Sequence, residues 1–397
     1  MLSPLLGILL LAAPQGPDTP GPHEVGIRDL LVQDQRFGQG TIDSRIYYPA
    51  TTAGMNTAAD PSGGPYPLVN MMHGWLGSAD GLDSISIHIA SWGFVVISTD
   101  TNRGFFPDTA DYARDSRSLL WWVEDEAQDI QSWLSGMVAP GTEWASTGHS
   151  MGGGTLGELV GIEPRVRTII GMQAAGNGAG ETAVENFDGQ CYWIAGSVDN
   201  IVRPNTVRSW FERANRNRHN VYFLVNGMGH LGPTENPPNN EPLPGAEQAR
   251  QHRLLLGGIF RYEMKGEEDL GRELFSMQTL GDPTDRECAN FAPMVWGAPD
   301  TPGSTQLALG TAARMFGGVA LAWSPTPAQR QTPYGLLGVD PLQTVRIFAG
   351  TGGASGVVEP LPFDASAFTG QTLYVTAAAL GAGRSPQLGN TVEIAVP

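Results

Sequence analysis

Short apolar segments of strand type alternate with longer amphipathic segments through most of this chain, and this alternation constrains the fold more than any other feature. Strands that alternate with helices of this length indicate βαβ units and a mostly parallel sheet flanked by helices. The expected strands are Ser44–Tyr48, Leu68–Met72, Phe94–Ser98, Trp144–Thr147, Thr168–Met172, Cys191–Ala195 and Val221–Val225. The expected helices are Leu82–Ser91, Asp111–Leu134, Thr155–Val160, Pro204–Asn215 and Ala246–Met264.

The composition changes near Cys288. Residues 289–397 carry nine charged side chains in 109 residues, against 54 in the first 288, and show no helical period. We therefore expect a main domain over residues 23–288 and a small all-β, sandwich-like accessory domain over residues 289–397. Attachment to a surface or polymer and plain structural support are both open as roles for the second domain. Its expected strands are Val319–Trp323, Thr344–Ala349, Thr372–Thr376 and Val392–Val396.

The N-terminus begins with the apolar stretch Met1–Ala13, in which Leu5–Ala13 has about the length of a signal-peptide core. The proline-rich stretch Pro14–Pro22 follows it. We expect residues 1–22 to be a signal peptide and linker, and the protein to be secreted, periplasmic or extracellular. The alternative is that this apolar stretch is not a signal peptide, because no Lys or Arg precedes its apolar core. No run of 18 apolar residues exists, so the sequence predicts no transmembrane helix.

The charge balance is strongly acidic, with 40 Asp and Glu against 23 Lys and Arg and a formal net charge of −17. Lys265 is the only lysine. A nucleic-acid-binding protein needs a basic surface, so the composition argues against that class. The two cysteines, Cys191 and Cys288, permit one disulfide in an oxidising compartment, and two separate buried thiols are the equal alternative. They form no metal-binding spacing, and we expect no metal site.

The sequence GHSMG (Gly148–Gly152) is a G-x-S-x-G motif between the expected strand Trp144–Thr147 and the expected helix Thr155–Val160. In this context the motif is typical of a nucleophile elbow, a turn too tight for side chains beside the serine. The turn lifts the serine hydroxyl above the sheet. We therefore predict that Ser150 is a catalytic nucleophile. A glycine-rich turn with an ordinary serine is the alternative, because the chain has 52 glycines.

A serine hydroxyl is a weak nucleophile and needs a general base. His230 ends the glycine-rich segment Asn226–His230 after the expected strand Val221–Val225, and elbow enzymes carry serine, acid and histidine in this chain order. We therefore predict that His230 is the base. The other histidines fit less well: His23 lies in the linker, His73 and His88 precede the serine, His149 adjoins it, His219 precedes the strand, and His252 lies on a polar, solvated helix.

The histidine needs an acid to orient it, and Asp199 follows the strand Cys191–Ala195, one strand before the histidine. We predict that Asp199 is this acid, although a turn or helix-capping role is the alternative. Its competitors precede that strand: Glu181, Glu185 and Asp188.

An acyl-transfer intermediate carries an oxyanion that needs two N–H donors. The residue after the nucleophile, Met151, supplies one, and the loop His73–Ser78 after an early strand supplies the other through Trp75. A turn with a packed tryptophan is the alternative for this loop. Trp75, His149 and Met151 are also the expected substrate contacts.

Together these segments resemble the polyesterase–lipase–cutinase family, the bacterial cutinase and poly(ethylene terephthalate) hydrolase group of α/β-hydrolases. The resemblance covers roughly Gly26–Met277 and extends, less closely, to dienelactone-hydrolase-like and platelet-activating-factor-acetylhydrolase-like esterases. The matching segments are HGWLGS (His73–Ser78), SWGFVVISTDTN (Ser91–Asn102), GHSMGGGTL (Gly148–Leu156), AGSVDNIV (Ala195–Val202) and the histidine loop.

The resemblance implies an α/β-hydrolase fold and an exposed, lidless cleft flanked by Trp75 and Met151. Two departures weaken the implication of aromatic polyester cleavage relative to plain ester cleavage. The family commonly carries a tryptophan after the strand that follows the nucleophile helix, but Gly171–Gly180 contains no aromatic residue. The proline-rich insert Gly232–Gly245 follows the expected base and would reshape the rim of the cleft.

We therefore expect a secreted, monomeric carboxylic ester hydrolase of cutinase or polyesterase type, with an ester or polyester substrate and no cofactor. One alternative is a small-molecule esterase, lipase or dienelactone-type hydrolase with the same triad and no polymer activity. Another is a catalytically silent binding protein of the same fold.

Overall fold

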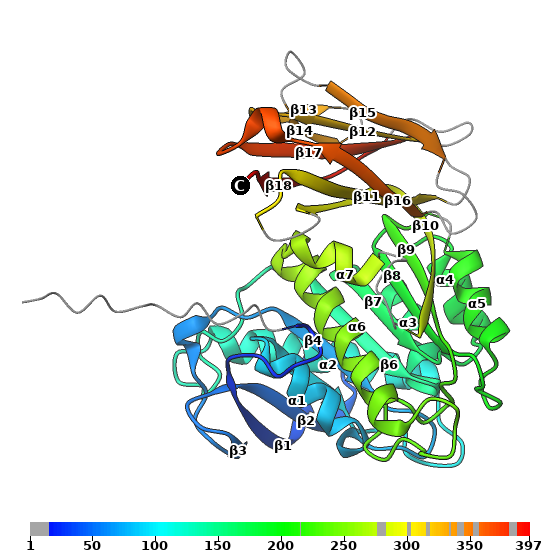
Figure 1. Cartoon of the computed structure of the whole chain (residues 1–397). Coiled ribbons are helices and arrows are strands. Elements are labelled where there is room, and N and C mark those ends of the chain that lie inside the picture. The colour runs from blue at the N-terminus through cyan, green and yellow to red at the C-terminus, as the bar shows by residue number, and fades with distance from the viewer. Residues whose placement is uncertain are drawn as a thin grey trace, which may run out of the picture.

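The computed structural model describes residues 16–214, 216–275, 283–299, 303–314, 318–332, 335–339, 345–351, 357–380 and 387–397. The expected signal peptide, within residues 1–15, lies outside the described residues. The described chain forms one large mixed sheet with helices on both faces and further β layers stacked beside one end of the sheet (Figure 1). This arrangement confirms the predicted α/β-hydrolase fold with a C-terminal all-β part.

The large sheet has the strand order β16-β11-β10-β9-β8-β7-β6-β4-β5-β2-β1-β3. The six adjacent central strands of this order, from β9 to β5, run parallel to one another, and the pairs β1–β2, β2–β5 and β9–β10 are antiparallel. The strands are β1 (Glu24–Asp34), β2 (Gly40–Ala50), β3 (Gly54–Met55), β4 (Leu68–Met72), β5 (Val95–Thr99), β6 (Trp144–His149), β7 (Val166–Met172), β8 (Gln190–Gly196), β9 (His219–Val225), β10 (Thr284–Pro299), β11 (Gln306–Arg314) and β16 (Val357–Asp364).

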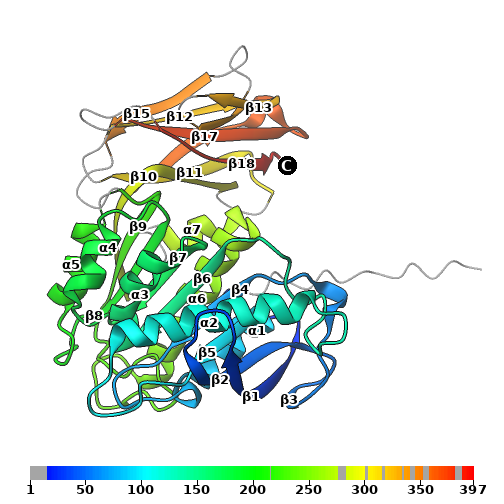
Figure 2. The ribbon, with the colours of Figure 1, turned by 180° about the vertical axis from the view of Figure 1, so that it is seen from behind.

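Helices cover both faces of this sheet, as a mostly parallel sheet requires. The helices α1 (Asp83–Ser91), α6 (Gly245–Lys265) and α7 (Gly271–Phe275) pack on the face seen in Figure 1. The helices α2 (Thr109–Gln128), α3 (Met151–Ile162), α4 (Gly178–Val184) and α5 (Pro204–Arg213) pack on the opposite face, which Figure 2 turns toward the viewer. Successive side chains of one strand enter the two cores alternately: Ile169 faces the α2–α5 core and Ile170 the α1–α6 core.

The helix expected over Asp111–Leu134 ends at Gln128. Beyond it, side chains bind nearby backbone groups and form turns in place of the next helical turn. Asp129 accepts a hydrogen bond from the Gln131 N–H at 2.9 Å, and the Ser132 hydroxyl accepts one from the Leu134 N–H at 3.1 Å. Such local bonds compete with helical ones, which explains why the apolar spacing overran the true helix end.

The C-terminal part forms two packed β layers, as expected of a sandwich. The four-stranded sheet β15-β12-β17-β18 faces the β10–β11–β16 edge of the large sheet (Figures 1 and 2). The C-terminal part also contains a two-stranded sheet, β13–β14. The core between the layers includes Val295, Leu309, Leu321 and Val375. The strands are β12 (Gly318–Ser324), β13 (Pro327–Thr332), β14 (Gly335–Val339), β15 (Val345–Thr351), β17 (Thr372–Leu380) and β18 (Gln387–Ala395).

The expected boundary after Cys288 falls inside strand β10. Residues Thr284–Cys288 pair with β9, and residues Met294–Pro299 of the same strand pair with β11. The two parts therefore share a continuous sheet.

Candidate active site

Ser150 occupies a strained turn between β6 and α3. Its backbone angles are φ 54° and ψ −114°, in a region that non-glycine residues rarely adopt. The flanking glycines leave the turn room: a Cβ on Gly148 would lie 2.5 Å from the carbonyl of Gly152, and a Cβ on Gly152 would lie 2.5 Å from the carbonyl oxygen of Met72. This geometry is that of a nucleophile elbow.

The side chains of Ser150, His230 and Asp199 form one hydrogen-bonded chain. Nε2 of His230 lies 3.0 Å from Oγ of Ser150, and Nδ1–H of His230 donates to Oδ2 of Asp199 at 2.8 Å. All three residues are largely buried. The three follow β6, β8 and β9, whose carboxyl ends lie at the same edge of the parallel sheet. The structure thus brings together the three residues that the sequence selected from distant segments.

The carboxylate of Asp199 is held in place by the backbone that follows it. Its Oδ1 accepts hydrogen bonds from the N–H groups of Ile201 and Val202, both at 2.9 Å, while Oδ2 faces His230. An acid fixed in this way holds the imidazole in the tautomer that presents an unprotonated Nε2 to the serine. Asp199 therefore fits both interpretations at once: Oδ1 caps the turn that follows it, and Oδ2 faces the histidine.

His149 lies behind His230. Its imidazole is buried, and its Nε2–H donates to the carbonyl oxygen of His230 at 2.8 Å, with the two ring centroids 4.8 Å apart. Burial, together with the nearby His230, lowers the pKa of His149 to about 3, so this ring stays neutral. The sequence suggested a substrate contact here. The structure instead has His149 supporting the backbone of the histidine loop.

A second buried layer lies beneath the histidine loop. Nε2 of Gln173 lies 3.8 Å from Sδ of Met228 and 3.4 Å from Nε2 of His252, whose Nδ1–H donates to the carbonyl of Gln248 at 2.9 Å. His252 is fully buried, so the expectation of a solvated position was wrong. Burial lowers its pKa to about 4. Nothing in the local sequence of His252 indicated this position, because its helix neighbours are mostly polar.

The two predicted oxyanion-hole residues belong to segments that adjoin the nucleophile. Met151 is the first residue of α3, so its N–H has no acceptor within the helix, and it lies at the positive end of the helix dipole. The loop with Trp75 passes close to the serine, since a Cβ on Gly74 would lie 3.2 Å from Cβ of Ser150. Tyr112 anchors this loop by accepting the His73 N–H at 2.8 Å. The arrangement has the elements of an oxyanion hole.

Apolar side chains surround the buried triad. Their exposure ranges from 41% at Val198 to 67% at Ile201, and Trp75 is 54% exposed. Each lies within two residues of a triad member or belongs to the loop after β4. This set, called the apolar rim below, comprises Trp75, Leu76, Val198, Ile201 and Leu231.

The insert Gly232–Gly245, which follows His230, contacts the segment at the start of α1. The Glu235 N–H donates to the carbonyl of Gly81 at 3.1 Å, and a Glu235 carboxylate oxygen accepts the Ser84 N–H at 2.5 Å. The insert therefore connects the histidine loop to the segment at the start of α1. No aromatic residue occupies Gln173–Gly176 after β7, where the resembled family commonly carries its tryptophan.

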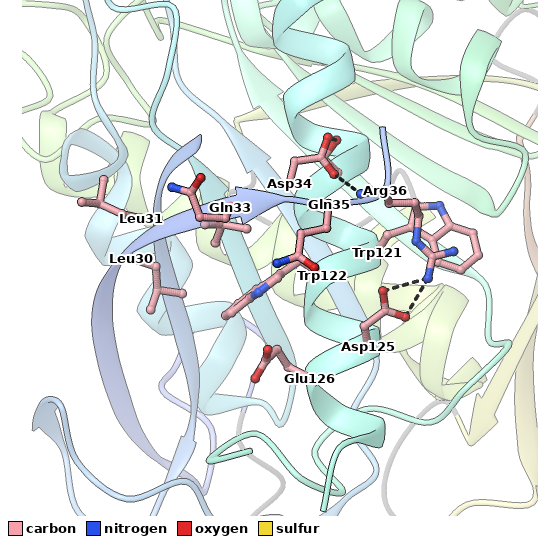
Figure 3. A pocket seen from close by; sticks show the side chains of 12 residues that line it. Leu30, Leu31, Gln33, Asp34, Gln35, Arg36, Trp121, Trp122, Asp125 and Glu126 are labelled. Carbon is pink, nitrogen blue, oxygen red and sulfur yellow. Dashed lines mark hydrogen bonds and ion pairs between the residues drawn. The ribbon is translucent and has the colours of Figure 1, made fainter. Parts of the chain in front are cut away.

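A pocket of about 550 Å³ lies elsewhere, between β1 and α2 (Figure 3). Arg36 and Asp125 form an ion pair across it at 2.8 Å, and the guanidinium of Arg36 stacks on Trp121. Its lining contains no triad residue and no residue of the apolar rim, so it is separate from the candidate active site.

The two cysteines are both buried and free, so the possible disulfide does not form. Strand β9 separates them: Cys191 on β8 pairs with Asn220, and Cys288 on β10 pairs with Val221. Two strand spacings amount to about 9.5 Å, which exceeds the reach of a disulfide. The alternative of two buried thiols is the one the structure has.

Across the described residues, no helix is both long and apolar enough to cross a membrane. Within the same residues, no cluster of three or more His, Cys, Asp or Glu side chains could hold a metal ion.

Comparison with known proteins gives two findings. The family model for PETase, described as PET hydrolase-like, matches residues 15–241, more than half of the chain and a range that contains Ser150, Asp199 and His230. The sequence is also 27% identical over 127 residues to chlorophyllase-2 of Arabidopsis thaliana, a match that covers 28% of this chain and 39% of that protein. The chain therefore aligns with less than half of the length of this relative.

Proposed function

Because this chain belongs to the PET hydrolase-like family, we propose that it is a secreted carboxylic ester hydrolase of polyesterase type that uses Ser150, His230 and Asp199 as its catalytic triad. The coarser part of this statement, a serine ester hydrolase of the α/β-hydrolase type, follows from the family and from the chlorophyllase relative. The observation that carries the triad assignment is the 3.0 Å approach of His230 Nε2 to Ser150 Oγ on a strained elbow.

In the first half of the reaction, Ser150 Oγ attacks the ester carbonyl carbon while its proton passes to His230 Nε2. The carbonyl oxygen becomes an oxyanion, and the N–H groups of Trp75 and Met151 stabilise it. Asp199 stabilises the imidazolium cation that forms. The intermediate collapses when His230 donates its proton to the leaving alkoxide, which departs as the alcohol and leaves an acyl ester on Ser150.

In the second half, a water molecule takes the place of the alcohol. His230 Nε2 accepts a proton from this water as the water oxygen attacks the acyl carbonyl. The same two N–H groups stabilise the second oxyanion. Collapse releases the carboxylic acid, and His230 returns the proton to Ser150 Oγ, so that every group regains its starting state.

The apolar rim supports an apolar ester as substrate. Its exposed side chains lie in the loops that carry or adjoin the triad residues, where an apolar substrate would contact them. A polyester chain is the substrate we propose, in keeping with the family. A small lipophilic ester is the second candidate, and two observations favour it: the missing tryptophan after β7 and the relation to a chlorophyllase.

One experiment separates these substrates. Release of soluble product from an aromatic polyester film is measured beside hydrolysis of p-nitrophenyl butyrate, with the Ser150→Ala protein as the blank. We expect both reactions, and a loss of about 10⁴-fold or more in kcat on substitution of Ser150. Cleavage of the soluble ester alone would move the substrate to small esters. Cleavage of neither by a folded protein would favour a binding protein of this fold.

Secretion and a monomeric state are part of the proposal and rest on the sequence. Cell fractionation followed by N-terminal sequencing of the mature chain tests secretion, and cleavage close to Ala13 is the expected result. Light scattering on the purified protein tests the monomeric state. A cell-retained chain with an intact Met1 would contradict the first statement.

A further inference from the structure

Two adjacent phenylalanines that do not belong to the apolar rim are both highly exposed to solvent. Phe105 is 72% exposed and Phe106 is 99% exposed, in the loop between β5 and α2. A single exposed apolar side chain is ordinary in a soluble protein, but adjacent exposed aromatic residues mark an interaction site. Phe105 and Phe106 are called the aromatic tip below. Because the side chain of Phe106 is almost fully exposed, it contributes little to the stability of the fold.

The loop that carries the aromatic tip is fixed at both ends. Asn102 adopts φ 60°, and its side-chain oxygen accepts the Asp108 N–H at 3.0 Å, which closes the loop. Asp108 then caps α2 by accepting the Asp111 N–H at 3.0 Å. The exposure of the tip is therefore set by hydrogen bonds at its base. An ordered tip spends less conformational entropy on binding than a flexible one.

Trp75 connects the aromatic tip to the site. Its indole Nε1–H donates to the carbonyl of Phe105 at 3.2 Å, and the two rings meet edge to face with centroids 6.2 Å apart. The residue before Trp75, Gly74, lies against Ser150. Tip and tryptophan therefore pack together, and the tryptophan belongs to the loop that adjoins the nucleophile, so an apolar phase touching the tip would lie next to the loop beside Ser150.

We propose that the aromatic tip docks the enzyme onto a neutral, aggregated ester phase by inserting Phe105 and Phe106 into it. This proposal rests on the proposed ester hydrolase activity and adds the physical state of its substrate. A neutral phase fits because the chain carries a formal net charge of −17, which anionic surfaces repel. The nearby cation, Arg103, is paired with Asp100 at 3.3 Å. Two side chains are also too small a patch for a stable protein partner.

The test compares dissolved and aggregated substrate with matched variants. The variants are Phe106→Ser and the double variant Phe105→Ser, Phe106→Ser. The control is Ile130→Ser, because Ile130 is 83% exposed but lies beyond the other end of α2, about 30 Å along a helix of that length. Rates are measured on p-nitrophenyl butyrate in solution and on a tributyrin emulsion. Adsorption to the emulsion is measured separately by flotation in the Ser150→Ala background.

We expect the double variant to lose about 10-fold or more in adsorption and in rate on the emulsion, because partial burial of two phenylalanines is worth at least that factor in a partition constant. Its kcat/KM on the dissolved ester should stay within about 2-fold of the wild type, and Ile130→Ser should behave as the wild type. Added salt should not weaken adsorption, since the contact is apolar.

Two results would overturn the proposal. Adsorption of the tip variants equal to that of the wild type would show that the tip does not dock. A parallel loss on both substrates would show that the tip only shapes the site. Failure of the proposed function is distinguishable from both, because a wild type without esterase activity can still be tested for adsorption in flotation.

Discussion

At the scale of single residues, His149 controls where the backbone of His230 lies. Its ring is neutral because burial lowers its pKa to about 3, and its one N–H lies on Nε2 because that atom faces the His230 carbonyl, which can only accept, at 2.8 Å. The His230 side chain must meet Ser150 and Asp199 at the same time, and a small shift of its backbone would lengthen both contacts. His149 is therefore a positioning residue.

We predict that His149→Phe lowers kcat on a soluble ester by about 10- to 100-fold with little change in KM, since misplacing a reacting group by about 1 Å can cost that much. A phenyl ring fills similar space but donates no hydrogen bond. His149→Gln should recover part of kcat, because its amide N–H can donate. Circular dichroism serves as the control for folding. Equal activity of His149→Phe and wild type would contradict the positioning role.

The triad residues were predictable from the sequence for a physical reason. Parallel strands place their carboxyl ends at one edge, so Ser150, Asp199 and His230 could be selected by following three strands in chain order. The support from His149 and the buried layer at Gln173 and His252 could not be found in this way. Those contacts depend on which way a ring points and how deeply a helix face is buried, and neither leaves a local pattern.

At the scale of single elements, the elbow between β6 and α3 depends on its glycines. A Cβ on Gly152 would overlap the Met72 carbonyl at 2.5 Å, and that carbonyl belongs to a central strand that cannot move. We predict that Gly152→Ala lowers the free energy of unfolding by about 3 kcal/mol or more, or prevents soluble expression. Urea unfolding measures the change.

The matched control for this prediction is Gly81→Ala. Gly81 has open space where a Cβ would lie and no positive φ, so its substitution should leave stability within about 0.5 kcal/mol. If Gly152→Ala unfolds at the same urea concentration as the wild type, the close approach of helix and strand is not what the elbow requires.

Other elements were predictable to different degrees. The strand Leu68–Met72 is a short apolar run between turn residues, and its predicted bounds are those observed. The end of α2 was misplaced because the side chains of Asp129 and Ser132 form turns that hydrophobic spacing does not register. Strand β10 was missed because its first residues, Thr284–Cys288, contain three consecutive charged side chains, Asp285 to Glu287, and neither an apolar run nor a period of two.

At the scale of the whole molecule, three buried histidines link stability to pH. Burial lowers the pKa of His149 to about 3 and those of His88 and His252 to about 4. The unfolded chain therefore takes up protons from about pH 6.5 downward, whereas the folded chain does not. The contribution of these histidines to the free energy of unfolding is therefore fully present above pH 6.5 and is lost as the pH drops toward 4. Each histidine lowers the free energy of unfolding by about 1.4 kcal/mol for each pH unit by which the pH falls within this window.

Asp115 acts in the opposite sense. Burial raises its pKa to about 6, so the folded state holds this proton more tightly than the unfolded state between about pH 4 and pH 6. One carboxyl cannot offset three histidines. We predict a urea midpoint that falls steadily from pH 7.5 to pH 5, measured by tryptophan fluorescence. A midpoint that is flat or rises over this range would contradict the linkage.

The shared strand β10 makes the C-terminal layers part of the main fold. Met294 and Trp296 lie beyond Cys288 yet are buried in the α1–α6 core, where a Cβ on Gly271 would lie 3.4 Å from that of Trp296. We predict that a chain ending at Cys288 loses about 10 °C or more in Tm, or is insoluble, because removing a buried tryptophan alone costs about 3–5 kcal/mol.

The full-length variant Trp296→Ala tests the same contact without deletion, and it should show a large part of the same loss in Tm. Thermal unfolding of both proteins, followed by circular dichroism, measures the effect, and hydrolysis of a dissolved ester reports whether the triad survives. A chain ending at Cys288 that unfolds at the wild-type temperature would show that the main fold is complete at that residue. The C-terminal layers would then be free to serve attachment alone, whereas the predicted loss makes structural support one of their roles.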